Sequence, residues 1–446
     1  LGLVYWMYNR DIQHSIDFIE KRFHKKPDVR DANLTVLKAG YNYGETAEIF
    51  TNRYQVDPAK LPAGSYRNVM GNEALAIGLV AASAKSGLNL FYAGYPITPA
   101  SDILHELAQH KNFGVRTFQA EDEIAAVTSA IGAAFGGTLA ATASSGPGIA
   151  LKAEGIGLAI MLELPLVIIN VQRGGPSTGL PTKTEQSDLL QAMYGRNGEA
   201  PIPVLACSSP KDAFATAYEA CRIAIEHMTP VFVLSDGYIA NGAEPWRYPT
   251  SGDLQEIRPP YVQIGTESYL PYKRDPRHVR QWAVPGIAGY EHRVGGLEKQ
   301  ADTGNVSYDP DNHQQMVRER EAKVNAIAEQ IPQQSLECGP EKGDVLVLGW
   351  GSTYGAIHTA VKDLLAAGAQ VAHAHLRYIH PFPSNLKTLL SNYEHVLIPE
   401  LNSGQLMRII RDEFLIEVHG LHKIKGLPFR AAEIHDALIQ LLQPHD

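Results

Sequence analysis

The sequence predicts an α/β protein in which a parallel sheet, covered by helices on both faces, is followed by a smaller domain of the same class. Two observations carry this prediction. Between Tyr66 and Tyr248, short runs that are apolar throughout alternate with segments of helical periodicity, and strands without a polar face are typical of parallel sheets buried beneath helices. The same alternation resumes at Val345, after a long irregular stretch.

In the first alternating region we expect a strand and a helix to follow one another repeatedly. The predicted strands are residues 88–92, 115–118, 139–143, 166–171, 204–206 and 231–234. The predicted helices are residues 71–85, 100–110, 123–135, 149–161, 185–193 and 212–227. Small residues are frequent in the helices at 71–85 and 123–135, and they permit the close approach of another helix or of a ligand.

The regions outside this domain have a different character. Residues 1–63 are polar, with helices expected at 12–23, 29–42 and 43–54, and they carry no chemical motif of their own. Residues 249–340 are rich in Pro, Tyr, Arg and Gly and predict an irregular arm that ends in a charged helix at 313–330. Arms of this length tend to be functional or to wrap a neighbour. The smaller domain, 341–446, contains predicted strands 345–348 and 370–376 and a predicted helix 354–367, and the segments 396–399 and Ala431–Leu442 complete it.

Composition excludes several classes of protein. The net charge of −9 and the pI of about 6.0 argue against broad nucleic-acid binding, which needs a basic surface. No apolar run approaches the length of a membrane span, and no signal peptide is visible. The three cysteines, Cys207, Cys221 and Cys338, form no C-x-x-C pair. We therefore expect no disulfide framework, no zinc site and no [4Fe–4S] cluster held by this chain alone, and a cytoplasmic location. Because the sequence begins with Leu1, we expect a fragment or a trimmed product.

Two turns at the carboxyl ends of predicted strands could carry chemistry. Residues 95–99 leave a buried strand and start a helix, with Thr98 as the expected N-cap and Pro99 at the first helical position. Residues 121–123 place three carboxylates at the next strand-to-helix junction. Favourable charge at a helix N-terminus explains any one of these acids as well as function does. A carboxylate that points into the small-residue helix behind them would instead be desolvated, and a cofactor nitrogen would satisfy it.

Two further turns follow the next two strands. Residues 142–148, Thr-Ala-Ser-Ser-Gly-Pro-Gly, bring backbone amides and hydroxyls to a helix start, which is an anion-binding arrangement. Arg173 opens a loop of Gly, Pro, Ser and Thr, where it could bind a carboxylate through its two-pronged guanidinium. A flexible surface loop is the alternative. Weaker candidates are His380, expected to be structural, His292 and Arg293, expected to be exposed, and the turn 349–353, which a plain helix cap explains equally well.

These motifs together resemble a known family. Residues 71–78, 95–99, 121–123, 142–148, 173–182 and 349–353 occur in the order and at the spacings found in the α subunit of 2-oxoacid:ferredoxin oxidoreductases. The resemblance is greatest to the 2-oxoglutarate type, in which a γ-domain precedes α. It implies the C-terminal remnant of a γ-domain at 1–63, a pyrimidine-type thiamine diphosphate-binding domain at 64–248, the arm at 249–340, and a transketolase C-terminal-like domain at 341–446.

The resemblance also implies an activity and a set of site residues. Family members decarboxylate a 2-oxoacid oxidatively and reversibly, pass electrons to ferredoxin and transfer the acyl group to coenzyme A; for 2-oxoglutarate the product is succinyl-CoA. Glu123 matches the acid that contacts N1′ of the thiamine aminopyrimidine. Thr98 matches the threonine near the 2-oxo and carboxylate groups of the substrate. The remaining expected substrate residues are Arg173, Thr178 and Thr182, and the remaining expected cofactor residues are Tyr95, Pro96, Ile97, Ser145 and Gly146.

Two absences from the sequence predict a partner. The G-D-G motif and downstream Asn that hold Mg²⁺ and the diphosphate are missing, as are cluster cysteines. We therefore expect a β subunit to bring Mg²⁺, the diphosphate site and the [4Fe–4S] cluster, in a dimer of αβ units that is active only when assembled. Two alternatives stay open: the same scaffold acting on pyruvate or a branched-chain 2-oxoacid, and a non-catalytic scaffold subunit of a thiamine enzyme.

Overall fold

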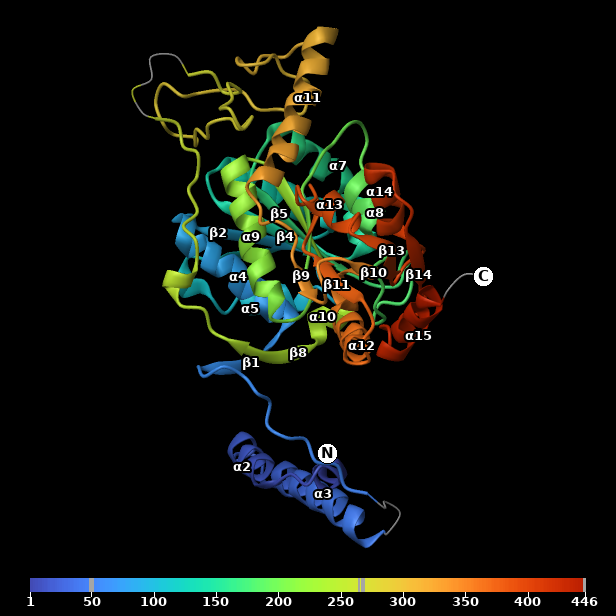
Figure 1. Ribbon diagram of the computed structural model, residues 1–446. Coiled ribbons are helices and arrows are strands. Elements are labelled where there is room, and N and C mark those ends of the chain that lie inside the picture. Colours follow the sequence, from blue (N-terminus) through green and yellow to red (C-terminus); the bar gives the residue numbers. More distant parts are fainter. Residues whose placement is uncertain (48–51, 264, 266–268, 444–446) are drawn as a thin grey trace. The chain divides into compact units, whose positions relative to one another are not determined.

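The structure is a computed structural model that describes residues 1–47, 52–263, 265 and 269–443 (Figure 1). It divides into two compact units, Leu1–Ser65 and Tyr66–Asp446. None of the described helices is long and apolar enough to cross a membrane.

The first unit consists of the helices α1 (Gly2–Met7), α2 (Gln13–Arg22) and α3 (Pro27–Thr46). Helices α1 and α3 pack closely because two glycines lie at their contact: an added Cβ at Gly44 would lie 2.6 Å from the Trp6 ring. The two helices predicted at 29–42 and 43–54 are wrong in their division, since α3 runs continuously through them to Thr46. Residues 48–51 of the second prediction lie outside the described residues, and residues 52–54 are not helical.

The core of the second unit is a seven-stranded sheet in the order β12-β6-β7-β5-β4-β2-β3. All neighbouring strands are parallel except β12, which pairs antiparallel with β6. The six predicted strands are therefore confirmed, as is the parallel sheet. Their bounds are β2 Leu90–Gly94, β3 Arg116–Gln119, β4 Leu139–Ser144, β5 Leu166–Gln172, β6 Val204–Ala206 and β7 Pro230–Asp236, and β12 is Tyr378–His380.

The direction of each crossover decides which face its helix covers. The connections from β2 to β3 and from β6 to β7 lead towards the β3 edge of the sheet. The connections from β3 to β4 and from β4 to β5 lead towards the β12 edge. Because such crossovers are right-handed, the two sets of helices cover opposite faces. One face carries α4, α5 and α9, where α4 and α9 lie side by side (Figure 1), and the other carries α6 and α7. The bounds are α4 Gly71–Ser86, α5 Ser101–Leu107, α6 Glu123–Phe135, α7 Gly146–Leu162 and α9 Asp212–His227.

The helix predicted at 185–193 begins later, as α8 (Leu189–Tyr194). Residues just before it bond elsewhere: Gln186 donates its backbone N–H to Leu401 O at 3.1 Å, and Asp188 donates its own to Gln172 Oε1 at 3.0 Å. These tertiary hydrogen bonds replace a first helical turn. A short helix α10 (Gly237–Asn241) follows β7.

The smaller sheet of the second unit has the order β14-β13-β10-β11-β9. The predicted strands at 345–348 and 370–376 and the predicted helix at 354–367 are confirmed, and the segments 396–399 and Ala431–Leu442 form the strand β13 and the helix α15. The short strands β9, β12 and β14 are absent from the prediction, because runs of three or four residues of mixed polarity show no period. The amphipathic helix α14 was missed although its ten residues do show helical periodicity. The bounds are β9 Leu336–Cys338, β10 Gly343–Trp350, β11 Val371–Leu376, β13 Tyr393–Glu400, β14 His419–His422, η4 Gly351–Thr353, α12 Tyr354–Ala366, α13 Leu386–Leu390, α14 Gln405–Phe414 and α15 Ala431–Leu442.

Gln186 joins the two sheets through its side chain. Its Nε2 donates to Trp350 O at 2.8 Å, and its Oε1 accepts from Leu401 N at 2.9 Å. Asn402 in turn donates to the backbone oxygen of Gln186 at 2.8 Å. All these groups are buried, so the carboxyl ends of the two sheets are fixed against each other.

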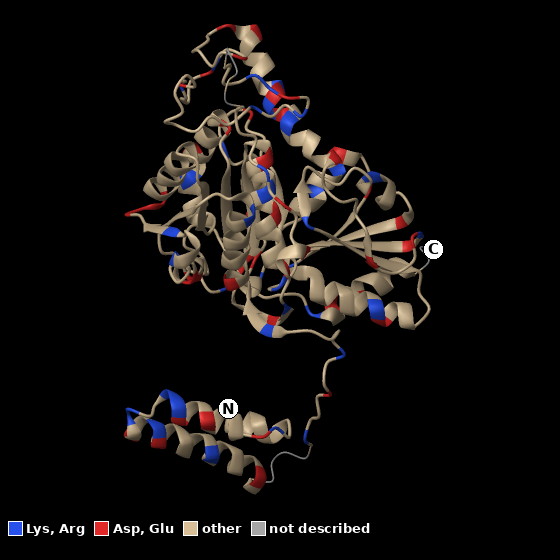
Figure 2. Cartoon of the chain, turned by 90° about the vertical axis from the view of Figure 1, so that its left-hand side faces the viewer, with Lys and Arg blue, Asp and Glu red and all other residues tan. Residues whose placement is uncertain are grey.

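The arm between the sheets is mostly irregular, as expected. The strands β1 (Tyr66–Met70) and β8 (Ala243–Arg247) form an antiparallel pair before it, and η2 (Ser251–Asp253) follows. The charged helix occurs as α11 (Pro310–Ala326) and η3 (Ile327–Glu329), a few residues earlier than predicted. In the view of Figure 2, Lys and Arg are interspersed with Asp and Glu along the chain. Such mixing agrees with the argument against a nucleic-acid surface.

Candidate functional site

Four predicted turns meet at one edge of the larger sheet. Strands β3, β2, β4 and β5 are neighbours and parallel, so the loops that follow them lie next to one another. Helix α5 follows β2 on one face and α7 follows β4 on the other face. The order of strands therefore reverses between β2 and β4, and open α/β sheets bind ligands in the crevice at such a point.

The first turn differs from its prediction. Thr98 is not an N-cap, because α5 begins at Ser101 with Ala100 before it. The chain first makes a separate turn, in which Ala100 N donates to Ile97 O at 2.8 Å and Ile97 N donates to the Ser101 hydroxyl at 2.9 Å. The Thr98–Pro99 peptide is cis. Ile97 is half-buried, and the other expected contact residues in this turn, Tyr95, Pro96 and Thr98, are exposed. The Thr98 hydroxyl therefore does not cap α5.

Of the three acids in the second turn, Glu123 alone is buried, with 8% of its surface exposed. Asp122 is the N-cap of α6 and accepts from Ala125 N at 2.7 Å, and Glu121 is exposed. The third turn packs on Glu123, since an added Cβ at Gly148 would lie 2.9 Å from Glu123 Oε1. Only a glycine allows this approach. The structure therefore separates one enclosed carboxylate from a capping residue and a surface charge.

Lys152 is a buried residue of this site that the sequence analysis did not identify. It lies on α7 and donates from Nζ to Thr142 Oγ1 at 2.6 Å and to Ala143 O at 3.3 Å. Burial lowers the pKa of Lys152 to about 7, and the charge of Glu123 opposes that shift. The available signal was a lysine in a largely apolar helical run, since a lysine is costly to bury unless it has partners.

The third turn presents unsatisfied polar groups. Helix α7 begins at Gly146 after Ser145, as predicted. The hydroxyls of Ser144 and Ser145 are buried and find no hydrogen-bond partner among the residues that the structure describes. Buried hydroxyls normally have partners, so these two indicate a polar ligand beside Glu123. The chemistry fits the polar edge of a thiamine aminopyrimidine.

Arg173, in the fourth turn, is buried and reaches the first turn. Its Nη1 donates to Thr98 O at 2.6 Å, while its Nε finds no partner among the described residues. The guanidinium therefore holds the turn that carries Thr98 and keeps unused donors. Thr178 and Thr182 lie further along the loop, and both are exposed.

Arg173 and Gly146 line one pocket of about 680 Å³ between the two sheets. Thr98, Glu123, Thr178 and Thr182 are not among its lining residues. Its other side is formed by residues of the smaller sheet's domain: Asn402, Ser403, Gln405 and Ile424. The remaining lining residues belong to the larger sheet's domain: Pro147, Ala150, Leu151, Gly174, Gly175, Pro176, Ser177, Glu185, Ser187, Asp188 and Gln191.

Asp188 is a second residue of this pocket that sequence reasoning missed. Burial raises the pKa of Asp188, and hydrogen bonds from Asn170 and Ser187, both at 3.0 Å, oppose the shift. The charge of Arg173 opposes it as well. No local pattern marks this aspartate, because its burial and its partner Asn170 on β5 depend on parts of the chain that are distant in sequence.

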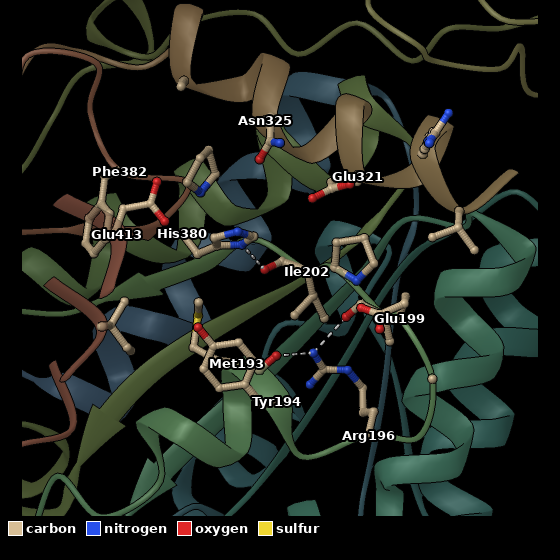
Figure 3. Close-up of a pocket in the computed structure, with 18 of the residues that line it drawn as sticks. Met193, Tyr194, Arg196, Glu199, Ile202, Glu321, Asn325, His380, Phe382 and Glu413 are labelled. Carbon is tan, nitrogen blue, oxygen red and sulfur yellow. Dashed lines mark hydrogen bonds between the residues drawn. The ribbon is translucent and has the colours of Figure 1, made fainter. Parts of the chain in front are cut away.

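A larger pocket of about 1130 Å³ lies between α11, the loop after α8 and the segment that begins at His380 (Figure 3). None of the predicted catalytic, substrate or cofactor residues lines it. His380 lines it and hydrogen-bonds through Nδ1 to Ile202 O at 2.8 Å, as expected for a structural histidine. Arg196 donates to the backbone oxygens of Ala192, Met193 and Ala200, each at 2.8 Å. Of the other weak candidates, Arg293 is exposed, whereas His292 is half-buried, so its predicted exposure is wrong.

Two segments of the chain match known domains. Residues 82–309 match the thiamine diphosphate-binding domain of pyruvate flavodoxin/ferredoxin oxidoreductases, and residues 343–435 match core domain II of pyruvate:ferredoxin oxidoreductase. The chain therefore belongs to the 2-oxoacid:ferredoxin oxidoreductase family and contains its thiamine diphosphate-binding domain, as its motifs predict.

Individual relatives carry more specific names. The chain is 53% identical to the 2-oxoglutarate oxidoreductase subunit KorA of Mycobacterium tuberculosis, over 97% of this chain and 66% of that subunit. It is 34% identical to the 2-oxoglutarate synthase subunit KorA of Archaeoglobus fulgidus, over 82% of this chain and 97% of that one. Its fold matches the 2-oxoglutarate:ferredoxin oxidoreductase from Magnetococcus marinus, solved with 2-oxoglutarate, coenzyme A and succinyl-CoA bound. The TM-score is 0.91 and the identity 32%, over 99% of this chain and 77% of that one.

Proposed function

We propose that this chain is the α subunit of a 2-oxoglutarate:ferredoxin oxidoreductase. The reaction is the reversible, coenzyme A-dependent oxidative decarboxylation of 2-oxoglutarate to succinyl-CoA, with electrons passed to ferredoxin. The observation that carries the proposal is the enclosed carboxylate of Glu123 beside two unpartnered serine hydroxyls, at the point where the strand order reverses. The names of the KorA relatives and the ligands of the solved relative support 2-oxoglutarate as substrate.

Several residues of this chain would contact the cofactor, each with a different role. When bound, thiamine diphosphate supplies the carbanion that attacks the 2-oxo carbon and the electron sink for loss of CO₂. Glu123 would hold the aminopyrimidine and exchange a proton at its ring nitrogen. Ser145, Gly146 and the turn formed by Tyr95, Pro96 and Ile97 would surround the ring. Lys152 lies close to Glu123 from inside α7, and the charge of Glu123 favours the protonated form of Lys152 against the effect of burial on its pKa.

The substrate side rests on Arg173 and Thr98. Because Arg173 is buried and retains unused donors, it can bind a carboxylate of a dicarboxylic substrate and orient the 2-oxo group for attack. The Thr98 hydroxyl would donate to the substrate. Thr178 and Thr182 would take part only if their loop folds over the site, since both are exposed here.

The proposal includes a partner subunit. A β subunit would bring Mg²⁺, the diphosphate site and a [4Fe–4S] cluster, and the assembly would be a dimer of αβ units that reduces ferredoxin. None of the three cysteines of this chain, all of which the structure describes, forms a disulfide. That state suits the reducing cytoplasm, which is the location we propose.

The test compares Glu123→Gln with the matched exposed variant Glu121→Gln in the complex reconstituted with its β subunit. Ferredoxin reduction should fall about 10²- to 10⁴-fold for Glu123→Gln, the range typical of a lost proton-transfer group, and stay within about twofold for Glu121→Gln. Full turnover by Glu123→Gln would mean that this carboxylate does not activate the cofactor and would favour the scaffold alternative.

A second comparison tests the substrate. Arg173→Ala also removes the hydrogen bond to Thr98 O, so a uniform loss of activity would report only the disturbed turn. The informative quantity is the ratio of kcat/KM for 2-oxoglutarate to kcat/KM for pyruvate. A dicarboxylate role predicts that this ratio falls at least about tenfold, the effect of one lost charged hydrogen bond. An unchanged ratio would favour a monocarboxylic substrate.

A further inference from the structure

A cluster of three metal-ligand side chains lies on the smaller sheet. Cys338 is on the edge strand β9, His373 on β11 is its cross-strand partner, and His358 comes from α12. The ligand atoms of the three residues all lie within 4.8 Å of one another. They are separated by 19 and 14 residues in sequence, so no short motif announces them.

The hydrogen bonds around His373 fix which of its nitrogens is available. His375 approaches Gly351 O through Nε2 at 3.0 Å, and a carbonyl oxygen only accepts, so Nε2 of His375 carries the proton. Both rings are buried, which favours the neutral form. Nδ1 of His375 is then an acceptor and receives the Nε2–H of His373 at 3.3 Å.

This chain of bonds leaves Nδ1 of His373 with a lone pair. That atom is buried and has no hydrogen-bond partner among the described residues. An imidazole held by a hydrogen bond on its far nitrogen, with the near nitrogen unprotonated, is the arrangement in which histidine ligates metals. The distance between the other two ligand atoms also fits a metal site, since Cys338 Sγ and His358 Nδ1 are 3.8 Å apart. Tetrahedral zinc with ordinary bond lengths separates sulfur and nitrogen ligands by about 3.6 Å.

We propose that Cys338, His358 and His373 bind a zinc ion. One thiolate and two imidazoles are ligands that zinc prefers, whereas Mg²⁺ and Ca²⁺ require oxygen. Cys338 and His358 are half-buried, so the fourth position faces solvent and takes water or an external ligand. The sequence predicts no zinc site, because its three cysteines form no closely spaced pair; here strand register and a covering helix assemble the ligands.

Tyr354 holds the histidine rings in place. Its ring stacks on His358 with centroids 5.4 Å apart and an interplanar angle of 12°, and it contacts His373 and His375 at 5.4 and 5.1 Å. Its hydroxyl donates to Glu337 Oε2 at 3.0 Å. The zinc ion would link the three-residue strand β9, which ends the arm, to both β11 and α12. Its role would be to hold the return of the arm onto the smaller sheet.

The experiment measures metal content in the full chain purified with its β subunit, after chelation, exposure to micromolar Zn²⁺ and dialysis. Zinc is counted by mass spectrometry separately from iron, and the contribution of the partner cancels between variants. We expect about one more zinc per chain in the wild type than in Cys338→Ala or His358→Ala, with zinc affinity reduced at least about tenfold in each. Cys221→Ala and His435→Ala remove a cysteine and a histidine elsewhere and should keep the full content.

Cobalt gives a second, spectroscopic readout of the same site. The wild type loaded with Co²⁺ should show the charge-transfer absorption of a thiolate–cobalt bond, and Cys338→Ala should lose it. His375→Gln should weaken zinc binding about 10- to 100-fold without removing a ligand, because His375 positions His373. Less than about a tenth of an equivalent of zinc in the wild type, or equal zinc in the wild type and Cys338→Ala, overturns the proposal.

Discussion

The carboxylate of Glu163 is predicted to hold the arm to the larger sheet's domain. Glu163 is the C-cap residue that follows α7, and its side chain is almost completely buried. Arg274 in the arm donates to both of its oxygens at 2.6 and 2.5 Å, and Lys323 on α11 donates to it at 2.5 Å. Arg274 and Lys323 hold the pKa of the Glu163 carboxyl well below its usual range. Glu163→Gln keeps the shape and leaves two buried cations facing a neutral amide.

The magnitude follows from the burial of all three groups. Breaking a buried ion pair by neutralising one partner costs about 3–5 kcal/mol, because the remaining charge stays desolvated. For a unit of this size, about 1–2 °C of melting temperature corresponds to 1 kcal/mol, so we expect a drop of about 3–10 °C. If only the arm detaches, the same 3–5 kcal/mol raises the population of the detached state about 10²- to 5 × 10³-fold.

Two assays separate these outcomes. Calorimetry reports loss of the whole unit, and trypsin cleavage after the exposed residues Lys273 and Arg277 reports detachment of the arm. Glu319→Gln is the matched control, since Glu319 faces the same Arg274 at 3.8 Å from a more exposed position. It should cost at most about 1 kcal/mol.

The dependence on pH has a definite sign. Since the folded-state pKa of Glu163 lies below the unfolded one, its contribution is complete above about pH 4.3 and is lost as the pH falls towards the folded value. The difference between wild type and Glu163→Gln should therefore persist at pH 5 and shrink below pH 4. A melting temperature within about 2 °C of the wild type, with no faster cleavage in the arm, would refute this reasoning.

Three other substitutions probe the site and its support. The pKa of Lys152 lies below its ordinary value, so the wild type should gain stability relative to Lys152→Met as the pH rises, by about 2–3 kcal/mol between pH 7 and 9. Denaturant titrations measure this difference in unfolding free energy, and a difference that stays constant with pH contradicts the prediction. Thr98→Val should lower kcat about 10- to 100-fold while Thr98→Ser keeps it, and melting temperatures should not change, because Thr98 caps no helix; normal turnover of the valine variant contradicts a substrate role. Gln186→Leu strands the buried groups Trp350 O and Leu401 N, and should cost about 2–5 kcal/mol in calorimetry; a loss below about 1 kcal/mol would mean that the two sheets do not depend on this residue.

Sequence patterns predicted the larger sheet well because its strands are buried on both faces and its helices are long. The helices Glu123–Phe135 and Asp212–His227 have the predicted bounds, since small or periodic residues fill them from end to end. The placement of four turns at one edge followed from parallel strands alone. What failed depended on contacts distant in sequence: α8 starts late because Gln186 bonds to the other sheet.

The candidate site divides in the same way. Arg173 was identified from its position after a strand, whereas Glu123 was selected from three neighbouring carboxylates by the family resemblance; the structure buries both. That Arg173 holds the Thr98 carbonyl could not be read from sequence, because the two residues lie 75 positions apart. Lys152 and Asp188 were missed because their partners come from other elements. The functional roles of the site residues and the domain boundaries stay predictions.

The antiparallel strand β12 has a consequence for how this chain can be divided. It belongs by sequence to the smaller domain, yet it covers the open edge of β6, with Tyr378 opposite Leu205 and Arg377 O accepting from Ala206 N at 2.8 Å. A truncation before residue 341 would leave β6 as an uncovered edge, which is a template for aggregation. The two domains should therefore be expressed together. In chimaeras made from relatives, we expect exchange of residues 66–446 as one piece to give folded protein, and exchange of only one domain to fail where β12 of one relative does not pair with β6 of the other.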